Sequence, residues 1–188
     1  MNLTWWQWAV ILAVLVLVGL YLSMTAGRLD RLHRRIETSA ASLDVLLTRR
    51  TALTLEIAGS GLLDPATSAV LLDSAHATLA ATQDGDDPSV RWLAESVLTR
   101  TLSQVFDDPT DVAELRDEPD VVPLLNSLAG TCQRVELSRR FLNDGVRACR
   151  QVRRQRLVRW LRLAGHTAWP QTVEMDDTPP VGLSGPPV

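Results

Sequence analysis

The feature that most constrains this chain is an uncharged and strongly apolar run near its N-terminus. Trp5–Met24 reads WWQWAVILAVLVLVGLYLSM, and no charged residue occurs from Asn2 to Gly27. A helix of about twenty apolar residues rises about 30 Å, which matches the hydrocarbon core of a bilayer. Three tryptophans stand at one end and Tyr21 near the other, where amphipathic aromatic rings favour the membrane interface. The run therefore predicts one transmembrane helix.

A cleaved signal peptide is the main alternative. Such a peptide has a basic start, an apolar region of about 7–15 residues and small residues before the cleavage point. Here no Lys or Arg precedes the run, the run is longer, and Met24-Thr25-Ala26 is a poor cleavage sequence. A core helix of a soluble protein is less favoured still, because such helices rarely lack a polar face over this length. We therefore expect a retained anchor.

The charges that flank the run predict its orientation. Arg28, Arg31, Arg34 and Arg35 follow the run, whereas its N-terminal side carries no Lys or Arg. Arginine and lysine concentrate on the cytoplasmic side of membrane spans. We expect a single-pass protein of the cell membrane, with its N-terminus outside and the rest of the chain in the cytoplasm.

The remaining chain carries helical patterns and almost no strand patterns. Residues 28–58 have coiled-coil spacing. Aspartate-proline pairs at 64–65 and 87–88 predict N-caps for two further helices, the first of which runs to about Gln83. The stripe of residues 28–58 consists of Leu29, Leu32, Ile36, Leu43, Leu46, Leu53 and Ile57, with Ser39 and Arg50 in its gaps. The buried side predicted for the helix from Pro88 consists of Val90, Leu93, Ala94, Val97, Leu98, Leu102 and Val105.

The last helical pattern runs from Val121 to about Ala164, after a short acidic helical turn that starts at Asp108-Pro109. Its apolar stripe consists of Val121, Leu124, Leu125, Leu128, Cys132, Val135, Leu142, Val146 and Cys149. Residues 176–188 are rich in proline and glycine, so they are expected to be disordered.

These patterns together predict an all-α fold. A transmembrane helix would continue into the first helix of an antiparallel, cytoplasmic four-helix bundle. The expected divisions are 1–27 for the N-terminus and anchor, 28–165 for the bundle, and 166–188 for an irregular tail.

Two cysteines, Cys132 and Cys149, lie on the same predicted helix, 17 residues apart. About 25 Å of helical rise would separate them, whereas a disulfide requires Cα atoms within about 7 Å. We expect two buried free thiols, as is usual in a reducing compartment.

Three segments resemble the LemA family of bacterial membrane proteins. Ala41–Arg50 (ASLDVLLTRR) is similar to the first soluble helix of that family, and Arg134–Arg147 (RVELSRRFLNDGVR) to its last long helix. Leu163–Pro170 (LAGHTAWP) is similar to its closing segment. The chain departs from the family pattern at Thr51–Leu55, Leu142 and Arg150. The resemblance implies a divergent member with an outside N-terminus and a helical bundle on the cytoplasmic face of the inner membrane.

No pattern for catalysis or cofactor binding stands out. The three histidines are scattered, and there is no Cys-x-x-Cys motif or glycine-rich phosphate loop. The prediction is therefore a protein without enzymatic activity or cofactor. One alternative is an enzyme whose site forms from the acidic 107–120 segment, in particular Asp107, Asp111 and Glu114.

Five polar residues form a candidate docking site: Arg49, Arg50, Arg139, Arg140 and Asn143. Arg50 and Arg139 occupy apolar stripe positions. The structural interpretation is a partly buried arginine that pairs with a carboxylate, for which Asp44, Glu56, Glu136 and Asp144 are near in sequence. The functional interpretation is a surface for an acidic segment of an unidentified membrane or envelope protein, with this chain as scaffold or adaptor.

Arginines also concentrate at the end of the last helix. Residues 131–165 hold ten arginines and two acids, whereas residues 84–120 hold eleven acids and three arginines. A basic amphipathic helix favours anionic lipid, so we expect contact with the inner leaflet. The alternatives are a solvated basic face and nucleic-acid tethering, the latter disfavoured because only one aromatic platform is well placed. The candidate membrane-surface residues are Arg150, Arg153, Arg154, Arg156, Arg159, Trp160 and Arg162.

Overall fold

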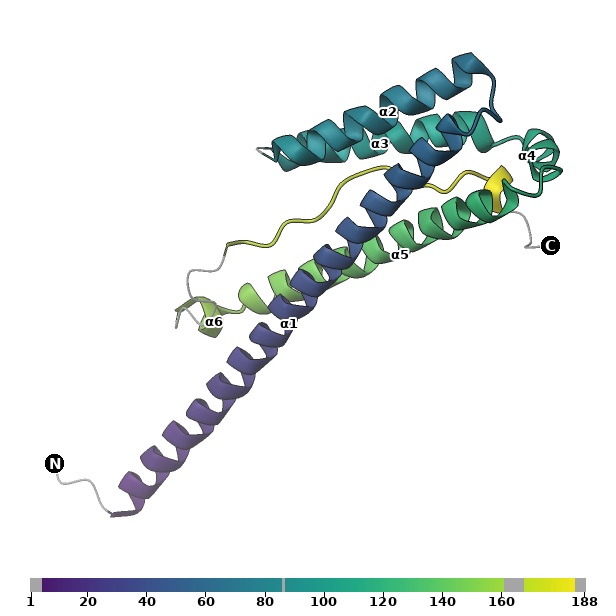
Figure 1. Cartoon of the computed structure of the whole chain (residues 1–188). Helices are drawn as coiled ribbons and strands as arrows, with labels where there is room; N and C mark the ends of the chain where they lie inside the picture. Colours follow the sequence, from purple (N-terminus) through teal and green to yellow (C-terminus); the bar gives the residue numbers. More distant parts are fainter. Residues whose placement is uncertain (1–4, 86, 161–167, 185–188) are drawn as a thin grey trace. The chain divides into compact units, whose positions relative to one another are not determined.

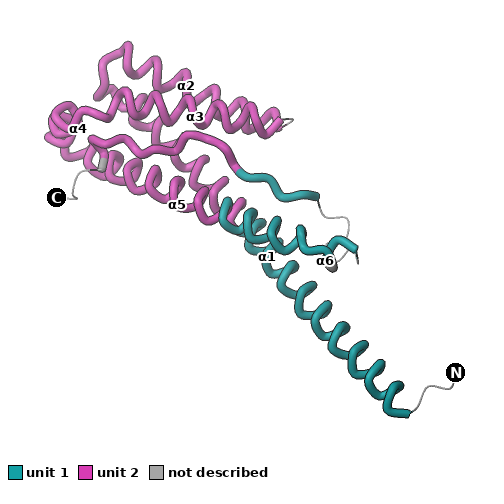
Figure 2. Tube along the Cα trace, turned by 180° about the vertical axis from the view of Figure 1, so that it is seen from behind, with its two compact units in different colours: residues 1–38, 143–172 teal, residues 39–142, 173–188 magenta. Residues whose placement is uncertain are grey.

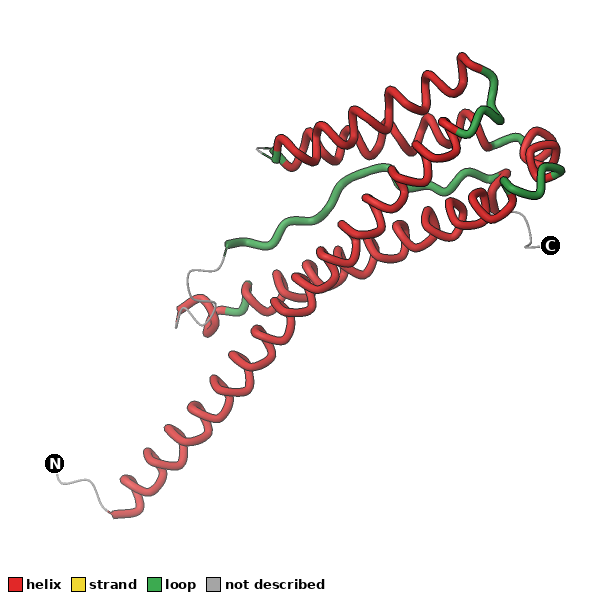
Figure 3. The backbone as a smooth tube through the Cα atoms, viewed as in Figure 1, coloured by secondary structure: helices red, strands yellow, loops and turns green. Residues whose placement is uncertain are grey.

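A computed structural model describes residues 5–85, 87–160 and 168–184 of the chain, and all regular secondary structure among these residues is helical (Figures 1 and 3). This confirms the predicted all-α class. The helices are α1 (Trp5–Gly59), α2 (Pro65–Asp84), α3 (Pro88–Phe106), α4 (Pro109–Arg116), α5 (Val122–Arg153) and α6 (Arg156–Trp160), followed by the 3-10 turn η1 (Gly182–Ser184).

Helix α1 is 55 residues long and begins with the apolar run. It is the one helix in the described part of the chain that is long and apolar enough to cross a membrane. Only 6% of its most apolar window is buried by the rest of the protein, so its leucines and valines lack a protein partner over most of the run. The apolar run and the first helical pattern are one continuous helix, as predicted.

Three helices begin at the predicted caps. The Asp64 carboxylate accepts hydrogen bonds from the backbone N–H groups of Ala66 and Thr67, at 3.0 and 3.1 Å. Asp87 and Asp108 each accept one N–H two residues further on, at 2.8 Å. A proline follows each cap, where its missing N–H costs no helical hydrogen bond.

The chain divides into two compact units (Figure 2). Unit 1 consists of residues 1–38 and 143–172, and unit 2 consists of residues 39–142 and 173–188. Both α1 and α5 contribute residues to each unit, and the two units are described separately below.

Unit 1 has a small apolar core beside the start of the charged part of α1. Leu29 packs with Cys149, Val152 and Val158, and each of these is at least 96% buried. Gly145 allows close approach of α5 in the same unit, because a Cβ there would lie 3.4 Å from Ile36. The C-terminal part of α5 is therefore held against the stretch of α1 that follows the apolar run.

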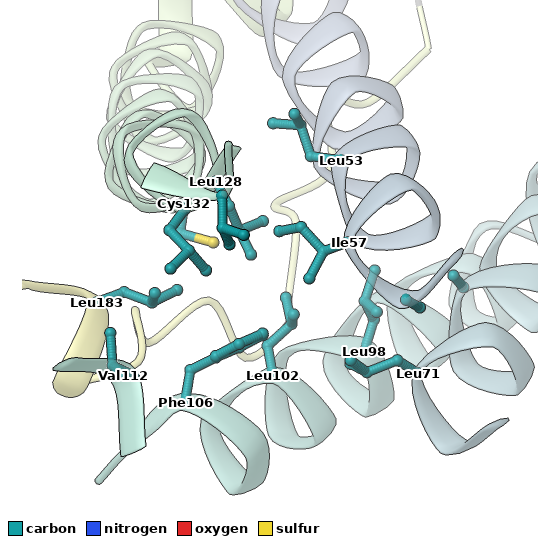
Figure 4. Packing of buried hydrophobic residues seen from close by; sticks show 14 residues of the cluster. Leu53, Ile57, Leu71, Leu98, Leu102, Phe106, Val112, Leu128, Cys132 and Leu183 are labelled. Carbon is teal, nitrogen blue, oxygen red and sulfur yellow. The ribbon is translucent and has the colours of Figure 1, made fainter. Parts of the chain in front are cut away.

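Unit 2 has the larger core, which contains side chains from α1, α2, α3, α4, α5 and η1 (Figure 4). Ile57 of α1, Phe106 of α3 and Val112 of α4 are at most 1% exposed in this cluster. The stripe predicted for the last helical pattern is confirmed here through Val121, which directly precedes α5, and through Leu125, Leu128 and Cys132 of α5. Helices α2 and α3 pack against each other, and α4 packs against η1.

The predicted uninterrupted helix from Val121 to Ala164 was wrong. Helix α5 ends at Arg153, and α6 starts at Arg156 after a tight turn in which Gln155 N donates to Val152 O at 3.1 Å. In a straight helix Val158 would lie about 240° around the axis from Val152, on another face. Because of the break, Val152 and Val158 are both buried in the same core. This packing explains why the helix ends here although no proline or glycine is present.

The predicted buried face of α3 was wrong in part. Val90, Leu93 and Val97 are 54%, 62% and 41% exposed. The residues of α3 that bury are instead Glu95, Leu98, Thr99, Thr101, Leu102 and Phe106. The pattern of apolar residues misplaced the face because two of the inward positions are polar and pair with Arg50.

The disorder predicted for the tail was also wrong for the residues that the structure describes. Residues 173–183, which we call the strap, run in extended form along unit 2 and end in η1 (Figure 1). Val173, Met175, Asp177 and Leu183 are all buried. Pro179, Pro180 and Gly182 disfavour an α-helix at this end of the strap but do not prevent packing, because the side chains buried against unit 2 lie before and after them in sequence.

Candidate functional site

A buried ion pair lies inside unit 2. Arg50 and Glu95 are each 1% exposed, and Arg50 Nη2 donates to Glu95 Oε2 at 2.6 Å. Arg50 Nη1 donates to Thr99 Oγ1 at 2.9 Å. The Nε atom of Arg50 is buried without a hydrogen-bond partner, so the guanidinium is only partly satisfied. Arg50 thus acts inside the fold, which corrects its prediction as a docking residue.

The Arg50 pair lies beside Cys132. Burial raises the pKa of the Cys132 thiol, and the positive charge of Arg50 opposes this rise only in part. Burial likewise raises the pKa of Cys149 in unit 1. Both cysteines are free and buried, as predicted, and the raised pKa values favour the protonated form of both thiols.

A second ion pair joins α5 to the strap. Arg139 Nε and Nη2 donate to the two carboxylate oxygens of Asp177, at 2.5 and 2.7 Å. This hydrogen-bonded carboxylate raises the pKa of the half-buried Arg139. A two-pronged contact of this kind fixes the orientation as well as the charge of the partner.

The partners predicted for these arginines from nearby sequence were wrong. Two of the proposed carboxylates are engaged elsewhere on the helices: Glu136 pairs with Arg140 and Asp144 with Arg147. Asp44 similarly pairs with Arg91. The actual partners lie 45 and 38 residues away in sequence, so only the fold brings them together.

The remaining predicted docking residues divide between surface and interior. Arg49 and Arg140 are exposed, whereas Asn143 is buried in unit 1. The structure therefore does not bring these five residues together as one exposed site.

Sequence reasoning missed Glu95, Thr99 and Asp177. Glu95 shares a helical stripe with Leu98 and Leu102, at spacings of three and seven, and this position could have identified it. Asp177 follows Val173 and Met175 with the two-residue spacing of an extended segment, a weaker signal within a proline-rich tail.

The predicted membrane-surface residues belong to unit 1, apart from Arg162, which lies outside the described residues. Arg150 Nε donates to Pro170 O at 2.8 Å, and Arg153 Nη1 donates to Ala168 O at 2.7 Å. The Arg153 guanidinium also stacks over the Trp169 ring, 4.9 Å from its centroid. The side chains of Arg154, Arg156 and Arg159 are exposed, and Trp160 is 81% exposed. The sequence also predicts an apolar face beside these arginines, formed by Leu157, Trp160, Leu161 and Ala164, and apart from Trp160 it lies outside the side chains that the structure describes.

The acidic 107–120 segment does not form one cluster. Asp107 accepts a hydrogen bond from Val181 N at 2.8 Å, while Asp111 and Glu114 line an open, exposed hollow of about 610 Å³. Among the described residues, no three His, Cys, Asp or Glu side chains group in a way that could hold a metal ion. Asp107 therefore binds the backbone of the strap, whereas Asp111 and Glu114 are exposed, solvent-facing charges.

Comparison with known proteins gives no further guidance, because no family model, no curated protein and no solved structure matches the chain.

Proposed function

We propose that this chain is a single-pass membrane protein whose helical domain is a non-enzymatic adaptor at the cytoplasmic face of the inner membrane. Its main helices would form an antiparallel four-helix bundle continuous with the anchor. The resemblance of Ala41–Arg50 and Arg134–Arg147 to the LemA family favours the same architecture.

One packing observation carries this proposal. Leu29, two residues after the uncharged stretch ends, packs with Val152 and Val158. A helix that crosses a bilayer through residues 5–27 would therefore hold α6 at the membrane surface. The arginines that follow the anchor would then lie beside four arginines at the end of α5, in the turn that follows it and in α6. We call the two sets together the basic collar, and it consists of Arg28, Arg31, Arg34, Arg35, Arg153, Arg154, Arg156 and Arg159.

The basic collar matches the chemistry of an anionic leaflet. Arginine near such a surface gains about 1 kcal/mol per residue, and this attraction falls with salt. Trp160 adds an exposed amphipathic ring, which favours the headgroup region. The positive-inside bias favours a cytoplasmic location for this collar and for the helical domain.

A fluorescence measurement on the full chain tests the collar. Trp160 is replaced by cysteine and labelled with an environment-sensitive dye, in a chain whose two native cysteines are alanine, and the protein is reconstituted in nanodiscs. We expect the dye emission to shift to the blue with anionic but not with neutral lipid. Added salt should reduce this shift, and so should replacement of Arg153, Arg154, Arg156 and Arg159 by glutamine. The same dye at position 90, an exposed site in unit 2, is the control. Equal emission with both lipids at position 160 would contradict the proposal.

Orientation has its own experiment. Single cysteines introduced at Asn2 and Val188 are exposed to a membrane-impermeant maleimide in intact cells. We expect label at position 2 only, and label at position 188 in intact cells would refute a cytoplasmic domain.

A further inference from the structure

The strap occupies a groove in unit 2 in the manner of a bound peptide. Val173, Met175 and Asp177 are buried, whereas the residues between them, Glu174 and Asp176, are exposed. Successive side chains of an extended chain point to opposite sides, so the groove contacts every second residue. Other proteins recognise extended segments from partners by this alternation.

The groove also binds the backbone of the strap. Ser96 Oγ accepts from Asp176 N at 3.0 Å, and Thr99 Oγ1 lies 2.9 Å from Asp176 O, to which it can donate. Each hydroxyl has a second acceptor within α3, because Ser96 Oγ is 2.7 Å from Trp92 O and Thr99 Oγ1 is 3.0 Å from Glu95 O. Removal of the strap therefore leaves neither hydroxyl donor unsatisfied, and the groove is compatible with exchange of its occupant.

Arg139 gives the groove its charge preference. Its guanidinium holds Asp177 through two hydrogen bonds, and the neighbouring Glu174 and Asp176 make the strap acidic. The planar guanidinium of arginine binds a carboxylate best, because two N–H groups meet two oxygens. An amide of the same shape should bind less tightly, and an apolar or basic side chain least tightly.

The strap fills one end of this groove incompletely. Val173 lines a largely apolar pocket of about 380 Å³, together with Leu43, Leu47 and Leu142. Trp92 and the Asp44–Arg91 ion pair also border this pocket. A larger apolar side chain at the place of Val173 would bury more surface, so a segment carrying one would bind more tightly than the strap.

We propose that this groove is a docking site for an extended acidic segment of another protein, and that the strap is its resident competitor. The segment has a large apolar residue at the place of Val173, an apolar residue at the place of Met175 and aspartate at the place of Asp177. This inference rests on the proposed adaptor function and names the kind of partner that the adaptor takes.

Synthetic peptides spanning residues 172–184 test the groove, with a fluorescent label and full-length protein in detergent. Three proteins are compared: the full chain, a chain that ends at Pro170, and a full chain with Asp177→Arg. The peptides are the native one, Val173→Phe, Asp177→Asn and Val181→Phe. Val181 is exposed in the strap, so Val181→Phe is the matched control for added apolar surface.

We expect the truncated chain to bind the native peptide about tenfold more tightly than the full chain, because its groove is empty. Val173→Phe should gain about tenfold and Asp177→Asn should lose about tenfold, while Val181→Phe binds as the native peptide does. The Asp177→Arg chain weakens its own strap without removing it. The Asp177→Arg chain should therefore also bind the native peptide more tightly than the full wild-type chain does. This second variant tests the groove even if truncation disturbs folding.

Three results would overturn the proposal. The first is no peptide binding by an Asp177→Arg chain of unchanged helicity, and the second is equal gain from Val173→Phe and Val181→Phe. The third is a doubled molar mass of the wild-type chain that Asp177→Arg abolishes, which would identify a second copy as the occupant. None of these measurements involves lipid, so they can fail while the basic collar holds, and the reverse is equally possible.

Discussion

Arg50 and Glu95 form an ion pair that is 1% exposed at both side chains and joins α1 to α3 inside unit 2. The desolvation of two charges is expensive, and their attraction offsets it only when the geometry and the surrounding hydrogen bonds are good. Here Thr99 supplies one further bond, whereas Arg50 Nε has none. The pair therefore fixes which face of α3 turns inward more than it adds to stability.

Removal of one partner should be far more harmful than removal of both. Glu95→Ala leaves a buried guanidinium without a counterion, and we expect it to lower the free energy of unfolding by about 3–5 kcal/mol. The double variant Arg50→Met/Glu95→Leu should lose much less, because two apolar side chains of similar volume need no partner. Urea denaturation of the single and double variants measures the difference. A double variant as unstable as Glu95→Ala would contradict this account.

The cap at Asp87 should contribute a pH-dependent part of the stability. The backbone N–H of Ser89 donates to the Asp87 carboxylate and lowers its pKa. A lowered folded-state pKa means that the stabilisation is present above the unfolded-state pKa, near 4, and is lost as the pH falls through the folded value.

Thermal midpoints at pH 6 and pH 3 check this cap. Asp87→Asn retains an oxygen acceptor but does not titrate, so its midpoint should fall less between the two pH values than that of the wild type. Asp73, an exposed aspartate within α2, provides the matched control, and Asp73→Asn should leave the pH dependence closer to that of the wild type. Identical pH dependence in the wild type and Asp87→Asn would refute the cap contribution.

The two thiols should report on opening of each unit. Cys132 and Cys149 are buried and their pKa values are raised, so both resist alkylation at pH 8 in the folded protein. Rapid labelling is expected only after addition of denaturant. Single variants Cys132→Ala and Cys149→Ala then assign each rate to unit 2 or unit 1. Fast alkylation of either thiol without denaturant would show that its unit opens readily.

Features of the fold that depend on residues close together in sequence were predicted correctly, whereas those that depend on distant contacts were not. Caps at Asp64 and Asp87 depend on residues two or three positions away, and both were found. The stripe of α5 was found because its inward positions are apolar and regularly spaced. The break after Arg153 was not found, because its cause is burial of Val158 beside Leu29, a contact between distant parts of the chain.

The sequence did not predict which polar residues of α3 are buried, nor that the strap packs against unit 2. The inward face of α3 depends on Glu95, whose partner Arg50 lies in another helix. Order in the strap depends on Arg139 meeting Asp177, and on a groove that exists only in the folded unit 2. Composition alone made this segment look incapable of packing, since proline and glycine indicate only that it cannot become a helix.

Gly182 fixes the end of the strap, and this yields the last prediction. A Cβ at this position would overlap Phe106 O and lie 3.1 Å from Asp108 O, and these backbone oxygens cannot move as a flexible side chain could. Gly182→Ala should therefore withdraw Leu183 from the core of unit 2, with a loss of about 1–3 kcal/mol typical of overpacking. Gly130→Ala is the matched control, because a Cβ there meets only the end of Arg134 at 3.8 Å. Inside a helix this control should gain up to about 1 kcal/mol. Hydrogen exchange of residues 173–183 should rise in Gly182→Ala and remain unchanged in Gly130→Ala, and equal exchange in both variants would show that Gly182 does not hold the strap.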